Sequence, residues 1–223
     1  MHQVSLVQHV LQRPELRKVL IADEVGLGKT IEAGLIVKRL IELKPGSRIL
    51  YLAPARLVSN VAFEFRDKLE LDARTWVAGS ASDARIGDDR LVIASIHKAV
   101  FGDNLPKVVD SGPWDVLIVD ECHHLSDWGW EGGKPNQSFR LVSQLIQSQP
   151  RDGRLILMSG TPHQGSNASP PPPARLFFLP DAAHAWREEV DGTTARLGVQ
   201  HLSNAYFRKS LEEVSWTQWL GCG

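Results

Sequence analysis

The sequence predicts an α/β protein, a three-layer sandwich in which a mainly parallel sheet lies between two layers of helices. Short apolar runs rich in valine, isoleucine and leucine alternate with stretches of helical apolar spacing from about residue 4 to residue 160. Strands that are buried on both faces and separated by helices are typical of parallel sheets. With 43% hydrophobic residues among 223, the chain is long enough to bury a core of this kind.

The first part of the chain contains the clearest alternation. Residues 4–11 carry valine and leucine at helical spacing and end before Pro14, and 18–22 is a short apolar run that we expect to be a buried strand. A long helix is expected over 30–43, with isoleucine, leucine and valine on one face and charged residues on the other. Lys-Pro-Gly at 44–46 ends this helix.

The following 115 residues continue the pattern, with β-branched apolar runs as strands and amphipathic stretches as helices. A Gly-rich polar segment at 126–137 is expected to be a loop. The expected elements are a strand over 48–53, a helix over 55–69, strands over 74–78, 91–96 and 115–119, a helix over 138–147 and a strand over 154–159.

The regular pattern ends near residue 165. Four consecutive prolines occupy 170–173, and the residues after them show no sustained period of 2 or 3.6. We therefore expect one domain over 1–165 and an unassigned, irregular C-terminal tail over 166–223 that is disordered or non-native.

Composition limits the classes of function. Lys and Arg total 25 against 26 Asp and Glu, so the chain has no overall basic field and any contact with nucleic acid must be local. Two cysteines are too few for a disulfide framework or a four-thiolate zinc site. No apolar run approaches the ~20 residues of a membrane-spanning helix, and the N-terminus lacks the pattern of a signal peptide. We expect a cytoplasmic protein.

A Gly-rich turn between the first strand and the following helix is suited to binding phosphate. Gly26 and Gly28 allow the backbone N–H groups to converge on a β-phosphate at the helix N-terminus. Lys29 would reach the β/γ oxygens of ATP, and the Thr30 hydroxyl would be a Mg²⁺ ligand. Asp23 stands where such loops usually have their first glycine. The alternative is a strand–helix turn with a chance Gly-Lys-Thr.

Two adjacent carboxylates follow the strand expected at 115–119. Asp120 suits a Mg²⁺ site beside the phosphates, and Glu121 suits orientation and deprotonation of the attacking water. A solvated turn is the alternative for an isolated acidic pair. His123 and His124 beside Cys122 do not indicate zinc, because neighbouring residues on an extended chain point to opposite sides and no second ligand pair is present.

Three segments carry a resemblance to a known family. They are Ala22-Asp-Glu-Val-Gly-Leu-Gly-Lys-Thr-Ile-Glu-Ala-Gly-Leu35, Asp120-Glu-Cys-His123 and Ser159-Gly-Thr-Pro162. In this order they resemble motifs I, II and III of the Swi/Snf branch of superfamily two helicase-like ATPases. The resemblance is strongest to the bacterial, RapA-like members of that branch. The resemblance covers roughly residues 2–165. It implies a P-loop NTPase, the first RecA-like lobe of a two-lobed motor that uses ATP and Mg²⁺ to move along double-stranded DNA.

The resemblance also implies roles for residues outside the ATP motifs. Gln3 resembles the end of the motif that reads adenine, although a frayed terminal glutamine is the alternative. Arg56 and Ser95 belong to segments similar to motifs Ia and Ib, which line the DNA groove and contact phosphates. Arg56 is equally suited to be a solvated residue at a helix start.

The same resemblance assigns coupling between nucleotide and nucleic acid to His123, Ser159 and Thr161. It implies double-stranded DNA, a second RecA-like lobe in the same protein or in trans, and RNA polymerase or other DNA-bound proteins as partners, with no membrane. The second lobe of this family supplies an arginine finger, and 166–223 resembles neither that lobe nor the linker to it. We therefore expect a truncated or frameshifted gene product.

Two other classes of function stay open. One is a non-catalytic module that holds ATP and DNA without turnover. The other is an unrelated P-loop kinase or transport ATPase, which explains neither the Ser-Gly-Thr segment at 159–161 nor the histidine after the acidic pair.

Overall fold

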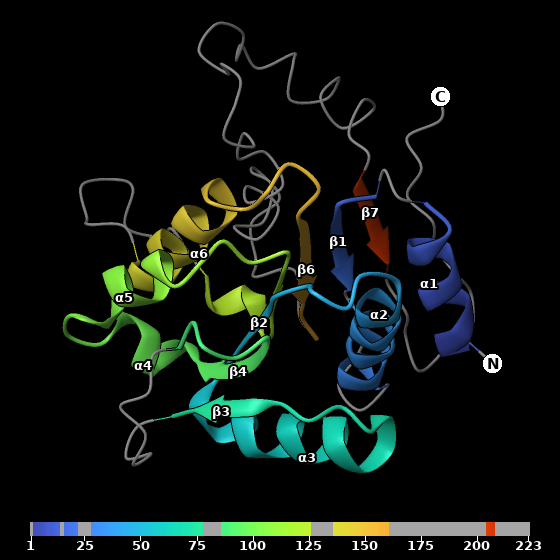
Figure 1. Cartoon of the computed structure of the whole chain (residues 1–223), viewed down its shortest axis with the longest axis horizontal. Helices are drawn as coiled ribbons and strands as arrows, with labels where there is room; N and C mark the ends of the chain where they lie inside the picture. Colours follow the sequence, from blue (N-terminus) through green and yellow to red (C-terminus); the bar gives the residue numbers. More distant parts are fainter. Residues whose placement is uncertain are drawn as a thin grey trace, which may run out of the picture.

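The structure is a computed structural model that describes residues 2–13, 16–21, 28–77, 86–125, 136–160 and 204–207. Seven strands form one sheet in the order β3-β4-β2-β5-β6-β1-β7, and every strand pairing is parallel (Figure 1). The strands are β1 (Lys18–Ile21), β2 (Ile49–Ala53), β3 (Arg74–Trp76), β4 (Leu91–Ser95), β5 (Val116–Val119), β6 (Arg154–Met158) and β7 (Asn204–Phe207).

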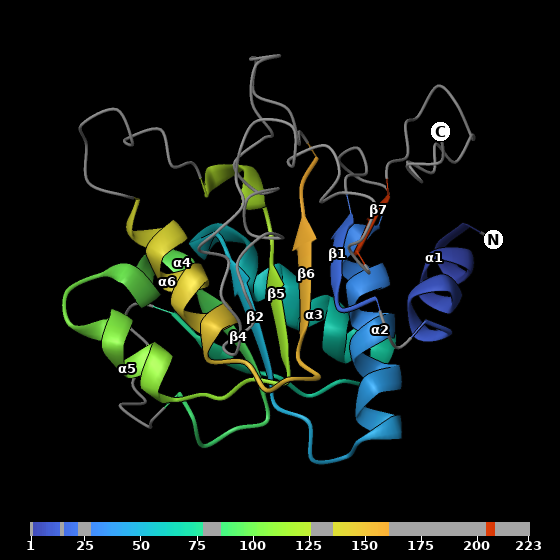
Figure 2. The same ribbon diagram turned by 90° about the horizontal axis from the view of Figure 1, so that it is seen from above.

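Helices cover both faces of the sheet, as the view from above shows (Figure 2). One face packs against α1 (His2–Leu11), α2 (Lys29–Leu43) and α3 (Val58–Leu69), and the other against α4 (Ile96–Val100), α5 (Asn104–Asp110) and α6 (Gln137–Gln147). Two short 3-10 helices, η1 (Ala55–Leu57) and η2 (Cys122–His124), follow β2 and β5. The structure therefore confirms the predicted three-layer α/β architecture with a parallel sheet.

The apolar side chains of each strand alternate between two cores. In β2, Leu50 and Leu52 point into the core on the α6 side, whereas Ile49, Tyr51 and Ala53 point into the core on the α2 side. This period of two is the geometry of any strand, and burial on both faces explains why the strands have almost no polar positions.

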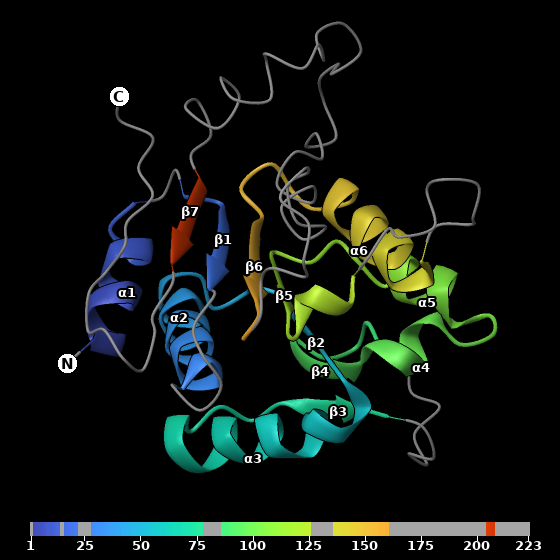
Figure 3. The ribbon, with the colours of Figure 1, turned by 180° about the vertical axis from the view of Figure 1, so that it is seen from behind.

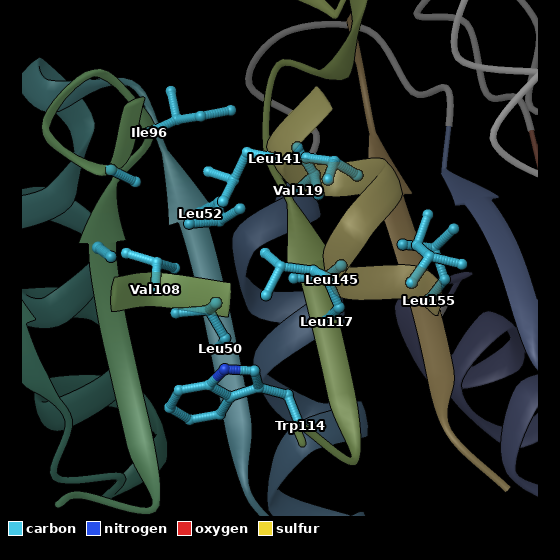
Figure 4. Packing of buried hydrophobic residues seen from close by; sticks show 14 of the residues in the cluster. Leu50, Leu52, Ile96, Val108, Trp114, Leu117, Val119, Leu141, Leu145 and Leu155 are labelled. Carbon is cyan, nitrogen blue, oxygen red and sulfur yellow. The ribbon is translucent and has the colours of Figure 1, made fainter. Parts of the chain in front are cut away.

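The core on the α6 side is shown from close by in Figure 4. Leu141 and Leu145 of α6 point toward the sheet and contact strand residues such as Leu117. Each such leucine contributes about 1.5–3 kcal/mol of transfer free energy when fully buried. The labelled residues of this core are Leu50, Leu52, Ile96, Val108, Trp114, Leu117, Val119, Leu141, Leu145 and Leu155.

A glycine allows α2 and α3 to approach closely on the opposite face. A Cβ added at Gly34 would lie 2.2 Å from Leu69 Cδ1 and 3.0 Å from the ring of Phe65. Both neighbours are buried in the core on the α2 side, so they have little room to move. Gly34 therefore sets the separation between the two helices and, with it, the position of α2 on the sheet.

Several elements differ from the sequence expectation. The helix expected over 55–69 is divided into η1 and α3. Strands β1, β3, β4 and β6 end one or two residues earlier than expected, whereas β2 and β5 begin one residue later and end as expected. Two short helices, α4 and α5, were not expected, because five and seven residues are too few to show a helical period. Most of the loop expected at 126–137 lies outside the described residues. No helix among the described residues is long and apolar enough to cross a membrane.

Strand β7 lies in the segment for which no regular element was expected. Residues Asn204–Phe207 pair in parallel with β1, in the register Lys18↔Asn204 to Ile21↔Phe207, at the edge of the sheet (Figure 3). A four-residue edge strand obtains its hydrogen bonds from its neighbour and needs no long periodic pattern. The other residues of 166–223 lie outside the described ranges, so the assignment of that segment stays a prediction.

A network at the amino-terminal edge of the sheet holds β2 against β5. The carboxylate of Asp115 accepts hydrogen bonds from the backbone N–H of Arg48 (2.8 Å) and from Lys44 Nζ (2.6 Å). The Arg48 guanidinium lies 4.5 Å from the centre of the Trp114 ring and donates to the carbonyl oxygen of Ser111 at 2.7 Å. This edge is therefore held by charge-assisted hydrogen bonds.

We expect Asp115→Asn to lower the free energy of unfolding by about 1 kcal/mol near pH 7. Partial burial by itself raises the pKa of Asp115, but the hydrogen bonds from Lys44 and Arg48 outweigh burial and hold the pKa below its usual range. The ionised form is thus favoured by folding, so its stabilisation is present above the unfolded pKa of about 3.9 and is lost as pH falls through the folded value.

The measurement is urea unfolding of the wild type and the variant at several pH values between 7 and 3. The stability difference should be full near pH 7 and should shrink in the most acidic samples. Asp152→Asn is the control, because Asp152 is exposed and lies 3.5 Å from the same lysine. A loss in the control as large as that in Asp115→Asn would contradict the assignment.

Candidate nucleotide-binding site

Parallel strands bring their carboxyl ends to one edge of the sheet, and the predicted site residues follow these ends. Lys29 and Thr30 begin α2 after β1, Asp120 and Glu121 follow β5, and Ser159 follows β6. β6 lies between β1 and β5, so these three strand ends are neighbours. The described part of the chain therefore brings most of the predicted ATP residues together.

Gly28 forms the entry to α2. Its φ of 87° and ψ of 26° are left-handed, a conformation that glycine adopts without the steric cost of a Cβ. Its carbonyl oxygen accepts hydrogen bonds from the N–H groups of Ile31 (2.9 Å) and Glu32 (3.0 Å), which begins the helix. Glycine brings no side-chain acceptor to this helix end, which carries partial positive charge and favours an anion. Gly26 lies outside the described residues.

Lys29 and Thr30 are half-buried in the first turn of α2. The Lys29 ammonium is close enough to Asp120 for its charge to lower the pKa of that carboxyl. The Thr30 hydroxyl lies close enough to the phenol of Tyr51 on β2 to lower the pKa of that phenol. The helix start and the end of β5 thus share one set of polar contacts.

Asp120 is buried, with 8% of its surface exposed, and both of its carboxylate oxygens are held. Oδ1 accepts from the N–H of Glu121 at 2.9 Å, and Oδ2 accepts from the hydroxyl of Tyr51 at 3.1 Å. Burial, followed by the charge of Glu121, raises the pKa of Asp120, and the two hydrogen bonds and Lys29 offset this only in part. A cation beside this carboxylate would compensate the cost of its burial.

The donor set fits Mg²⁺. Each carboxylate oxygen of Asp120 accepts one hydrogen bond from the protein, so each keeps a lone pair for a cation or for the water molecules bound to it. Together with the Thr30 hydroxyl, Asp120 supplies the hard oxygen ligands that Mg²⁺ prefers, and phosphates and water usually complete its coordination. These residues also lie beside a helix N-terminus that suits phosphate. Asp120 and Thr30 would hold the metal.

Glu121 has an unusual backbone conformation. Its φ of 49° and ψ of 45° are left-handed, which costs a residue other than glycine roughly 1–2 kcal/mol. The left-handed turn ends β5 and leads directly into η2. The side-chain atom Oε2 lies 3.2 Å from Nδ1 of His123, so the carboxylate is held beside the strand end.

His123 connects the ends of β5 and β6. Its Nδ1 lies 3.1 Å from the hydroxyl oxygen of Ser159, which is fully buried. Burial and the neighbouring His124 lower the pKa of His123, and Glu121 opposes this shift only in part, so the ring is neutral near pH 7. Because a carboxylate only accepts, the contact with Glu121 places the ring proton on Nδ1. Thr161 lies outside the described residues.

The residues predicted to contact DNA lie at the same edge of the sheet but differ in exposure. Arg56 is exposed in η1, directly after β2. Ser95 is 1% exposed, and its hydroxyl accepts a hydrogen bond from the N–H of Lys98 at 3.2 Å, which caps α4. The DNA contacts of both residues stay predictions. Gln3 lies in α1, where the structure describes only its backbone.

Tyr51 belongs to the site but was missed from the sequence. It occupies the middle of β2, where an apolar side chain was expected, and is fully buried. The signal that could have found it is a hydroxyl-bearing residue within an otherwise aliphatic strand. Its partner Asp120 is 69 positions away, so only the pairing of β2 with β5 shows the contact.

Known proteins match both the sequence and the fold. Residues 1–164 match the family model described as type III restriction enzyme, res subunit. The chain is 34% identical over 168 residues to the RNA polymerase-associated protein RapA of Pseudomonas putida (strain W619) and 35% identical over 168 residues to that of Stutzerimonas stutzeri (strain A1501). Both alignments cover 73% of this chain and 17% of the relative.

A solved structure described as the Sulfolobus solfataricus SWI2/SNF2 ATPase core in complex with dsDNA has a similar fold. The TM-score is 0.68 at 14% sequence identity, and the match covers 95% of this chain and 44% of that chain. An identity this low shows the fold alone.

The fold, the residues at the carboxyl ends of the strands and the similar known proteins all indicate the same class of protein. This class is the RecA-like lobe of helicase-like ATPases. The chain belongs to the family of the type III restriction enzyme res subunit model, as a first RecA-like lobe of the Swi/Snf-type, RapA-like branch of superfamily two. The predicted family and fold class are confirmed. The chain spans 17% of the length of the curated relatives it matches.

We expect Lys29→Ala to weaken ATP binding by about 10- to 100-fold, the range for loss of a hydrogen bond to a charged group. The measurement is titration with a fluorescent ATP analogue. Lys107→Ala, which removes an exposed lysine on α5, is the control and should bind as the wild type does. Equal affinities of Lys29→Ala and the wild type would contradict the phosphate-binding role.

Proposed function

We propose that this chain is the ATP-binding lobe of a DNA-dependent, helicase-like translocase. Paired with a second lobe, it would couple ATP hydrolysis to movement on double-stranded DNA. The observation that carries the proposal is the convergence of Lys29, Thr30 and Asp120 beside the open N-terminus of α2. These three groups and the helix end provide charge and ligands for a magnesium-bound triphosphate.

The residues divide the chemistry among them. Lys29 stabilises charge on the β- and γ-phosphates, and Thr30 and Asp120 orient the metal, which when bound neutralises developing negative charge on the phosphates. Glu121 orients the attacking water and accepts its proton. The Nδ1 atom of His123 contacts both the Glu121 carboxylate and the Ser159 hydroxyl, which links the hydrolytic group to the end of β6.

The DNA side of the proposal has two kinds of support. The ends of β2 and β4 lie next to each other, with Ala53 paired to Ser95, and exposed Arg56 follows close by. The structural neighbour is described as bound to double-stranded DNA, and the sequence relatives are named as RNA polymerase-associated. We propose that this chain also binds double-stranded DNA, and that its movement along DNA acts on RNA polymerase or another DNA-bound protein. ATP and DNA as substrates favour the cytoplasm.

The alternative is a module that binds ATP and DNA without turnover. The place of the Glu121 carboxylate, directly after Asp120 and beside His123, favours catalysis, because a general base must lie close to the phosphates and the metal. Hydrolysis that is stimulated by duplex DNA, in an assembly with a second lobe, separates the two functions.

We expect Glu121→Gln to keep nucleotide affinity within about twofold, since the variant leaves the groups that hold phosphate and metal unchanged. Hydrolysis by the assembly with the second lobe should fall by about 10²–10⁴-fold, the usual contribution of a general base. Phosphate release and nucleotide titration measure the two effects. Glu42→Gln, at an exposed position near the C-terminal end of α2, is the control. Parallel losses of binding and turnover in Glu121→Gln would indicate a structural role.

We expect the 223-residue chain alone to hydrolyse ATP very slowly, even with saturating duplex DNA. One lobe leaves the far side of the γ-phosphate in water, where electrostatic stabilisation is screened. The arginine finger of a second lobe is worth about 10³–10⁵ in turnover. The test is steady-state phosphate release with and without DNA, before and after a second-lobe protein is added. Fast DNA-stimulated turnover by the chain alone would contradict this expectation.

A further inference from the structure

Tyr51 bridges the two predicted magnesium ligands from within the sheet. Its hydroxyl donates to Oδ2 of Asp120 at 3.1 Å, and the Thr30 hydroxyl lies close enough to act on the same phenol. The ring is fully buried and meets Phe65 edge to face, with ring centres 5.6 Å apart and an interplanar angle of 89°. The phenol therefore has a fixed position, set by packing on one side and by the two polar partners on the other.

The register of the sheet explains why a tyrosine reaches this place. Tyr51 pairs with Ile118, and both side chains lie on the α2 side of the sheet. Asp120 is two residues beyond Ile118, so alternation returns its side chain to the same face about 6.6 Å further along the strand. A phenol spans this distance and ends in a donor, whereas an aliphatic side chain at this position would leave Oδ2 without that donor.

The hydrogen bonds also set the direction of the lone pairs. Because the phenol proton goes to Asp120, the phenol oxygen can only accept from the Thr30 hydroxyl beside it. A threonine that gives its proton away from the site keeps its oxygen lone pairs for a cation. A phenol, with an ordinary pKa of about 10, keeps its proton near pH 7.

We propose that Tyr51 is a positioning residue for Mg²⁺, which orients the Asp120 carboxylate and the Thr30 hydroxyl before the metal–nucleotide arrives. The inference rests on the proposed function, since it concerns the same site. A carboxylate that is held on both oxygens loses less freedom when it binds a cation, and fixed partners of this kind typically change metal affinity by 10–100-fold. Tyr51 does not contact the nucleotide in this scheme. Its removal should therefore affect the metal-dependent part of nucleotide binding alone.

The test compares the wild type with Tyr51→Phe in the full chain. Phenylalanine keeps the contact with Phe65 and removes only the hydroxyl. A fluorescent ATP analogue is titrated in two arms, one with Mg²⁺ and one with EDTA. We expect Kd to rise about tenfold in the Mg²⁺ arm and to stay unchanged in the EDTA arm. In a chain that already carries Asp120→Asn, adding Tyr51→Phe should not raise the Kd measured with Mg²⁺ any further.

A matched control separates positioning from stability. Ile146→Val removes one buried methyl group from α6, on the opposite face of the sheet, and should leave both arms unchanged. Equal changes of Kd in the two arms, no change in either, or an unfolded Tyr51→Phe by circular dichroism would assign the phenol to stability and overturn the inference. A wild type whose binding does not depend on Mg²⁺ would overturn the proposed function as well, so the two failures are distinguishable.

Discussion

The parallel direction of the strands is the constraint on which the site depends. Both faces of the sheet are filled by apolar side chains under helices, so polar groups can leave the sheet only at its two edges. At the amino-terminal edge they form the network around Asp115, which holds strands together. At the carboxyl edge, Thr30, Asp120 and Ser159 come from distant parts of the sequence and share one region. The location of the chemistry thus follows from topology before any single contact is considered.

Local patterns predicted much of this arrangement from the sequence. Lys29 and Asp120 were predicted as partners because each follows an apolar strand, and parallel strands end together. Contacts between residues on different strands could not be predicted from such local patterns. The role of Tyr51 depends on which strand lies beside β2, and the cap formed by Ser95 depends on a helix too short to show a period. Strand β7 was missed for a related reason, since an edge strand is defined by its neighbour.

Unfavourable features are concentrated at the end of β5. Asp120 is a buried carboxylate, Glu121 has a left-handed backbone, and His123 is kept neutral by burial. Each of these features costs stability. Asp120 accepts a hydrogen bond from Tyr51 of β2, His123 contacts Ser159 directly after β6, and the Glu121 carboxylate lies against His123. Natural proteins accept such local costs where function requires fixed geometry. The two cores on either side of the sheet supply the free energy that makes this possible.

The absence of a side chain at Gly34 connects packing with ligand recognition. Any larger residue would press against Leu69 and Phe65 of α3 and push α2 away from that helix. Since Lys29 and Thr30 are carried by the first turn of that helix, such a movement displaces them relative to Asp120, which is carried by the sheet. Position 34 is one turn of helix away from these residues and touches no ligand. Replacing this glycine by a residue of higher helix propensity, a common route to thermal stability, would therefore also change the affinity for nucleotide.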